Sequence, residues 1–385
     1  MNSRPAFHTD VAAIHLSVVF WLISAIPCRA QFNTEQVRSL TARAETGDAQ
    51  AQSDLGNLFA PDLATGRVTT TNDWGQAAKW LRMAAEQGVA SAQFGLGFLC
   101  ANGLGTPQDY AQATRWYLKA AEQGEVDAEY SLGKLFLEGL GVPRDYGKAV
   151  KWLREAASRG QGQAQLALGN IYFDGKGAPQ DYASAAAWYR KAADLGISEA
   201  QLRLSTMYRL GKGVPKSYGA SAEWCSRAAD RGSAEAQFEL GVMYFSGQGV
   251  PRDYAEAVFW YRKAGEQGQA DAQNALGFMY SNGKGVPQDY TAAAAWYRKA
   301  ADLGQAAAQY YLGNLYAKGL GVQQDSVRAY RWYLLAEASI DSRNPFGGEV
   351  SQAIKAIGRR MTPDQIARAQ EEASTWTAQH SNTTY

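Results

Sequence analysis

Residues 124–160 read GEVDAEYSLGKLFLEGLGVPRDYGKAVKWLREAASRG, and closely similar stretches return along the chain with a period of 36 residues. Eight tryptophans mark the period at a constant interval: Trp80, Trp116, Trp152, Trp188, Trp224, Trp260, Trp296 and Trp332. A fixed period in this range indicates a repeat array. Because so short a unit cannot bury its apolar face alone, the sequence predicts one stacked solenoid in place of separate globular domains.

Each unit is predicted to form two helices. Leu132 and Leu135 have the spacing of an amphipathic helix, which Gly139 and Pro143 end, because glycine takes the left-handed conformation and proline lacks an N–H. Asp145 is then placed to cap the second helix by accepting hydrogen bonds from its first backbone N–H groups. The tryptophan row, with the residue after each tryptophan, is predicted to be buried core.

This pattern resembles the Sel1-like repeat family, which is related to tetratricopeptide repeats. The motifs that carry the resemblance are LG at 132–133, GLGVPRDY at 139–146, AVKW at 149–152 and AASRG at 156–160. Tetratricopeptide repeats have a period of about 34 residues and lack this loop. The resemblance covers residues 47–340. It implies an all-α fold, a right-handed α/α superhelical solenoid of about eight helix pairs whose first helices line a concave face. It also implies a scaffold or adaptor role.

The flanking segments are predicted to cap the array and to direct export. Residues 31–46 and 341–377 are expected to form capping helices, and residues 378–385 a disordered tail. Residues 1–30 carry an apolar run, VAAIHLSVVFWLISAI, followed by small residues before a cut at Gln31, which is typical of a secretory signal peptide. We therefore expect an exported protein, periplasmic or secreted, without an integral membrane span after cleavage. An uncleaved anchor is the alternative.

Basic and acidic side chains are balanced over the chain. Residues 31–385 contain 36 basic and 36 acidic side chains, so no net field draws in nucleic acid. One basic cluster stands out in the fifth unit: Arg203, Arg209, Lys212, Lys216, Arg227 and Arg231. It predicts either contact with an acidic partner or, as is more usual, a solvated face.

Catalytic chemistry is not expected. The histidines are His8, His15 and His380, which fall in the predicted signal and tail, so a histidine base or histidine-bound zinc is not predicted. Cys100 and Cys225 lie more than three units apart, too far for a disulfide, and are expected to be buried thiols. The sequence therefore predicts no enzyme, no cofactor and no metal.

The candidate binding surface consists of two variable rows on the first helices. The rows lie two residues after, or one residue before, the conserved leucine of each first helix. Their members are Phe98, Lys134, Asn170, Arg203, Thr206, Glu239, Val242, Phe278, Tyr311 and Asn314. The aromatic members are predicted anchors, because large rigid side chains supply most interface energy. The alternative is that they pack against neighbouring first helices.

These features predict an exported, non-catalytic scaffold that binds a protein or peptide partner along its concave face. The chain is also expected to be a monomer, and the resemblance adds the expectation that it regulates an envelope or host-interaction pathway. A cell-wall or carbohydrate-binding module is the alternative, because groove aromatics suit stacking on sugars.

Overall fold

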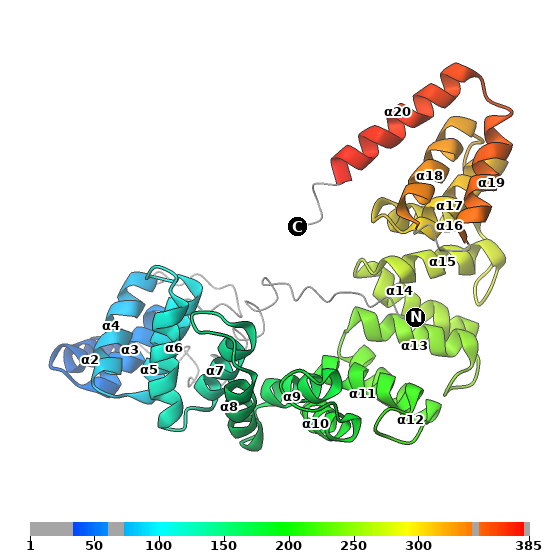
Figure 1. Ribbon diagram of the computed structural model, residues 1–385. Coiled ribbons are helices and arrows are strands. Elements are labelled where there is room, and N and C mark those ends of the chain that lie inside the picture. The colour runs from blue at the N-terminus through cyan, green and yellow to red at the C-terminus, as the bar shows by residue number, and fades with distance from the viewer. Residues whose placement is uncertain (1–33, 61–72, 341–345, 381–385) are drawn as a thin grey trace. The chain divides into compact units, whose positions relative to one another are not determined.

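The computed structural model describes residues 34–60, 73–340 and 346–380, in which every regular element is an α-helix and no strand occurs (Figure 1). The all-α prediction is therefore confirmed. The chain divides into two compact units, residues 1–181 and residues 182–385. The predicted signal peptide, residues 1–30, lies outside the described residues.

The first unit contains the predicted N-terminal capping helix and the first helix pairs. Its helices are α2 (Thr34–Glu45), α3 (Ala49–Phe59), α4 (Trp74–Glu86), α5 (Ala90–Asn102), α6 (Tyr110–Glu122), α7 (Val126–Glu138), α8 (Tyr146–Ser158) and α9 (Gly162–Asp174).

The second unit begins with the second helix of the fourth repeat. Its repeat helices are α10 (Tyr182–Asp194), α11 (Ser198–Leu210), α12 (Tyr218–Asp230), α13 (Ala234–Ser246), α14 (Tyr254–Glu266), α15 (Ala270–Asn282), α16 (Tyr290–Asp302), α17 (Ala306–Lys318) and α18 (Ser326–Ser339). Two helices follow, α19 (Phe346–Gly358) and α20 (Pro363–His380), and both pack on α18.

Helix α20 is longer than the sequence pattern suggested. It continues to His380, so the first three residues of the predicted disordered tail are helical. The helix can continue because residues 364–380 contain neither proline nor glycine to stop it. Residues 381–385 lie outside the described part of the chain.

Within each unit, neighbouring helices pack in chain order. A first helix packs on the second helix of its own repeat, which then packs on the first helix of the next repeat. First helices of successive repeats also contact one another: α3 contacts α5, α7 contacts α9, and α15 contacts α17. First helices therefore lie on the more tightly packed side of the stack, as expected for the inner face of a helix-pair solenoid.

The turns follow the predicted chemistry. Gly139 ends α7 in the left-handed conformation, with φ of +74°. Asp145 caps α8, accepting a hydrogen bond from Lys148 N at 3.0 Å. In the fifth repeat Ser217 replaces the aspartate and still caps α12, accepting from Ala220 N at 3.2 Å. These local signals fix where each helix begins and ends.

The tryptophan row is only partly core, which corrects the sequence-based expectation. Trp80, Trp224, Trp260 and Trp332 are buried, whereas Trp116, Trp152, Trp188 and Trp296 are half-buried. A cation lies over the ring in each half-buried case, as Lys191 Nζ does 4.2 Å from the centroid of Trp188. The position after the tryptophan is the uniformly buried one: Leu81, Tyr117, Leu153, Tyr189, Cys225, Tyr261, Tyr297 and Tyr333.

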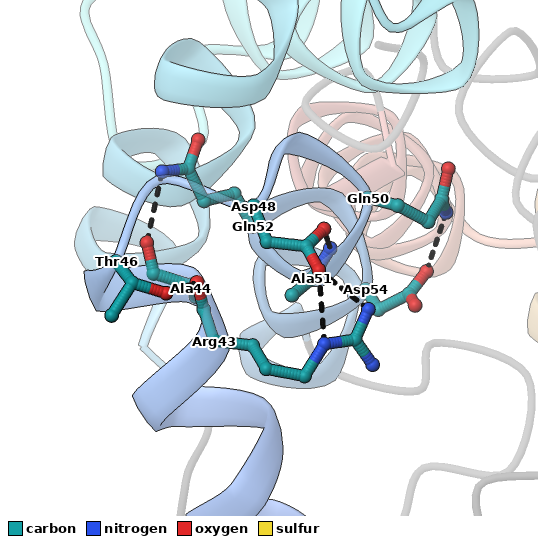
Figure 2. Close-up of polar contacts among 8 residues, drawn as sticks. All are labelled: Arg43, Ala44, Thr46, Asp48, Gln50, Ala51, Gln52 and Asp54. Atoms are coloured by element: carbon teal, nitrogen blue, oxygen red, sulfur yellow. Dashed lines mark hydrogen bonds and ion pairs between the residues drawn. The ribbon is translucent and has the colours of Figure 1, made fainter.

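In every repeat except the third, a buried glutamine near the start of the first helix bonds to the helix that precedes it. Its side-chain amide donates to a carbonyl eight residues earlier, at the end of the preceding helix. Figure 2 shows the first example, in which Gln52 Nε2 donates to Ala44 O at 2.9 Å. The same bond recurs for Gln93, Gln165, Gln201, Gln237, Gln273 and Gln309. It satisfies a buried helix-end carbonyl at each of these joints.

Candidate functional site

The ten predicted binding residues lie on seven first helices, from α5 to α17. A helical residue turns about 100° from its predecessor. Positions two after and one before a buried leucine are therefore turned about 160° and about 100° away from that leucine. Nine of the ten side chains are half-buried, and they are spread along the repeats, not gathered into one pocket. Within each unit, such an arrangement offers a track for an extended segment of a ligand.

Phe98 does not belong to this track. It is only 6% exposed and packs in one apolar cluster with Phe94 and Leu99 of the same helix α5. Its predicted role as an exposed anchor is therefore wrong. Phe98 is instead part of the apolar core around α5.

The two other aromatic candidates are half-exposed and belong to aromatic clusters of the second unit. The Tyr311 ring centroid lies 5.4 Å from that of Tyr297 and 5.4 Å from that of Tyr310. The Phe278 ring on α15 meets Phe245 of α13 edge-on at 6.1 Å. Because neighbouring rings restrain them, these side chains lose little freedom when a partner covers them.

The other candidates differ in what their side chains contact. Asn314 Oδ1 accepts a hydrogen bond from the Tyr333 hydroxyl at 2.8 Å, which occupies it within the repeat. Arg203 forms an ion pair with Glu199 at 3.5 Å. Lys134 lies 5.8 Å from the Tyr130 ring, and partial burial lowers the pKa of its ammonium group. The remaining members are half-buried on their helices: Asn170, Thr206, Glu239 and Val242.

Glu129 is a buried charge that the candidate rows do not include. It occupies the glutamine slot of the third repeat, its side chain is 3% exposed, and its Oε2 has no hydrogen-bond partner. Arg159 Nη2 lies 3.7 Å from Oε1, while Arg159 Nη1 donates to Gly124 O at 2.8 Å. An ionised glutamate has no proton to donate to the helix-end carbonyl that glutamine reaches in other repeats. The glutamate is visible in the aligned sequence, but its burial is not.

The ionisation of Glu129 makes the stability of the contact between α6 and α7 depend on pH. Burial raises the pKa of the Glu129 carboxyl, Arg159 opposes the shift, and Glu155 and Glu125 add to it. When the folded pKa of an acid exceeds the ordinary value of 4.5, the folded state holds its proton to higher pH than the unfolded state does. The contribution of the Glu129 carboxyl to the free energy of unfolding is therefore most favourable at low pH and falls as pH rises above about 4.5.

Replacing Glu129 by glutamine should stabilise this joint at neutral pH by about 1–2 kcal/mol, because glutamine restores a donor to the buried carbonyl. The gain should shrink below pH 4.5, where a protonated glutamate can donate as glutamine does. Hydrogen exchange of α6 and α7 amides across this pH range measures it. The double variant Glu129→Gln/Arg159→Gln reproduces the Gln93–Gln123 pair, bonded at 2.8 Å, and is the matched control. A gain independent of pH would contradict the ionisation argument.

The described residues offer little for metal or nucleophilic chemistry. No group of three His, Cys, Asp or Glu side chains among them is placed to hold a metal ion. Cys100 and Cys225 are buried free thiols, as predicted, and burial raises the pKa of Cys225 to about 12. Because the thiolate is the reactive form, this thiol is poorly nucleophilic. The His380 ring stacks on Trp376 at 4.0 Å within α20.

Comparison with known proteins agrees with this architecture. The Sel1 repeat family model matches residues 49–89, 90–125, 126–161, 162–197, 198–233, 234–269, 270–305 and 306–339. This chain belongs to the Sel1 repeat family. Proteins of the family generally act as non-enzymatic scaffolds for protein interaction. Among the described residues, no helix is both long and apolar enough to cross a membrane.

Two solved structures are similar over most of the chain. A Sel1 repeat protein from Oxalobacter formigenes is 34% identical, with a TM-score of 0.62, and the match covers 87% of this chain and 92% of that one. A protective antigen of uropathogenic Escherichia coli with an SLR fold is 31% identical, with a TM-score of 0.55, covering 89% of this chain and 94% of that one. No curated protein matches.

Proposed function

We propose that this protein is an exported, non-catalytic scaffold that binds a segment of a partner protein across the first helices of its second unit. The observation that carries the proposal is the pair of half-exposed aromatic residues Phe278 on α15 and Tyr311 on α17. They lie in variable slots of neighbouring repeats, next to the constant leucine of each first helix. Large, restrained aromatic side chains are the usual anchors of protein interfaces.

Export is supported by the amino-acid sequence. The apolar run of residues 11–26 and the small residues before Gln31 have the layout of a cleaved signal peptide. The mature protein would then act in the periplasm or outside the cell, as a monomer, on an envelope or host-interaction pathway. The two polar-faced ends support the monomer, because the outward positions of α2 and α20 are mostly exposed polar residues.

A carbohydrate or cell-wall ligand is the second candidate. Tyr310 and Tyr311 on α17 form part of an aromatic cluster with Phe346 of α19, with the Tyr310 and Phe346 rings 4.9 Å apart. The rings meet edge-on or tilted, and such half-exposed aromatic rings can contact sugars as well as side chains.

Phe278→Ala/Tyr311→Ala should weaken partner binding by at least about tenfold, because both anchors are removed. The test is crosslinking in the native host from a photoreactive residue at Val242, followed by affinity measurement with the captured protein. Phe259→Ala/Leu303→Ala is the matched control, because it removes two exposed apolar side chains, 48% and 59% exposed, from the second helix α14 and from the C-cap of the second helix α16.

The outcomes separate the proposals. Loss of the crosslinked protein only in the Phe278/Tyr311 variant supports the scaffold. Equal loss in the control would contradict the proposed face, and capture of cell-wall fragments alone would favour the carbohydrate ligand. The captured mature chain should begin at Gln31; a chain that keeps Met1 in the cytoplasm would contradict export.

A further inference from the structure

The turn between α11 and α12 differs from the other turns of the array. It carries two exposed apolar side chains, Leu210 at 49% and Tyr218 at 39% exposed. Three cations accompany them: Arg209, Lys212 and Lys216. We call these five residues the fifth-repeat turn. The slot of Leu210 is polar or charged in the other repeats whose turns are described: Asn102, Glu138, Asp174, Ser246, Asn282 and Lys318.

The charge of this turn is also distinct. Residues 209–218 contain three cations and no acidic residue, because Ser217 replaces the usual capping aspartate. The corresponding segments of the second, third, fourth, sixth, seventh and eighth repeats have a net charge of zero or −1. A local positive field in an otherwise balanced chain favours an anionic partner at this place.

The rest of the basic cluster noted in the sequence is engaged within the fold. Arg203 pairs with Glu199 at 3.5 Å, and Arg227 pairs with Glu223 at 2.7 Å. The guanidinium of Arg231 lies against Gly196. The structure therefore divides the cluster, and the cations next to exposed apolar surface are those of the fifth-repeat turn.

The lysines of the turn are held over aromatic rings. Lys216 Nζ lies 5.0 Å from the centroid of the exposed Tyr218 ring, and Lys212 Nζ lies 5.0 Å from that of Tyr182. Neither Arg209 nor Lys216 forms an ion pair with a carboxylate in the described residues. A partner carboxylate would meet restrained cations beside an apolar surface, an arrangement that gives both charge and shape recognition.

We propose that the fifth-repeat turn binds an acidic segment of a partner protein, with an apolar side chain of that segment packed on Leu210 and Tyr218. Nucleic acid and anionic membranes fit less well. Those ligands favour extended basic surfaces, whereas this patch is confined to one turn. In addition, the adjoining helices carry the exposed acidic side chains Glu199 and Glu223. The patch lies on the turn between two helices and is independent of the Phe278 and Tyr311 face.

The test uses the full mature chain and fluorescein-labelled synthetic peptides. One peptide has four glutamates flanking two leucines, the second replaces the leucines by serines, and the third replaces the glutamates by lysines. Fluorescence anisotropy at low salt should give the highest affinity for the glutamate–leucine peptide. Lys212→Glu/Lys216→Glu should weaken that binding by about tenfold, and added salt should weaken wild-type binding.

A matched control exists in the same two slots of other repeats. Arg252→Glu/Lys284→Glu makes the same change in net charge in the sixth and seventh repeats and should change affinity by less than about twofold. Leu210→Ser should weaken binding of the leucine peptide but not of the serine peptide. Circular dichroism confirms that each variant keeps its helix content.

Several results would overturn the proposal. These are equal weakening in the control variant, equal affinity for glutamate and lysine peptides, or binding indifferent to the Lys212 and Lys216 changes. Tighter, turn-dependent binding of single-stranded DNA or of phosphatidylglycerol vesicles would also reject an acidic protein segment as the ligand. Loss of partner binding through Phe278 and Tyr311 would not affect these outcomes, because the peptides are tested directly.

Discussion

Gly285→Ala is expected to destabilise the contact between the sixth and seventh repeats by about 3–5 kcal/mol. Gly285 has φ of +70°, and a Cβ there would lie 2.3 Å from Tyr254 O and 2.4 Å from Tyr254 C. Both atoms belong to backbone at the start of α14, which moves only if the two repeats separate. The cost therefore combines left-handed strain with a clash that a side-chain rotation cannot relieve.

Gly304→Ala is the matched control for this prediction. Gly304 also has positive φ, +81°, but a Cβ there would meet nothing within 4 Å. Its replacement should cost only about 1–2 kcal/mol of backbone strain. Hydrogen exchange of α14 and α15 amides measures the difference, since a repeat array need not unfold in one step. If the two replacements caused equal losses of stability, the clash between the sixth and seventh repeats would contribute nothing to the cost of Gly285→Ala.

Cys225→Tyr is expected to destabilise the fifth repeat by about 3 kcal/mol, and Ser205→Gly should largely reverse that loss. In the second, sixth, seventh and eighth repeats a first-helix glycine faces a second-helix tyrosine, so closely that a Cβ at Gly241 would lie 2.6 Å from the Tyr261 ring. The fifth repeat has Ser205 in the glycine slot and the smaller Cys225 in the tyrosine slot. The two changes compensate in volume.

The alternative packing of the fifth repeat has its own hydrogen bonds. Ser205 Oγ donates to Ser221 O at 2.8 Å, and Cys225 Sγ donates to Ala236 O at 3.3 Å. Ser205→Gly alone should therefore cost about 1–2 kcal/mol, through a lost bond and a small cavity. Thermal unfolding of both single variants and the double variant completes a double-mutant cycle. If the single losses simply add in the double variant, the packing explanation is incorrect.

The candidate binding surface could be predicted only in part. The spacing from Leu276 and Leu312 turns Phe278 and Tyr311 about 160° and about 100° away from those leucines, and both are half-exposed. The same spacing turns Phe98 away from the corresponding leucine of its helix, yet Phe98 is buried. Periodicity gives the direction of a side chain from its own helix, whereas exposure depends on what neighbouring elements place over it. The partner-binding role of the remaining candidates stays a prediction.

The sequence by itself determined the helices, their order and their ends. Asp145 caps a helix and Gly139 closes one through interactions within a few residues, and the 36-residue period repeats these signals along the chain. Only the tertiary structure decided which charges are buried and which packing partners compensate. Glu129 is buried beside Arg159, 30 residues later in the chain, and Ser205 and Cys225 compensate in volume although 20 residues separate them. Both properties arise from packing between separate helices, where burial and volume determine the energy.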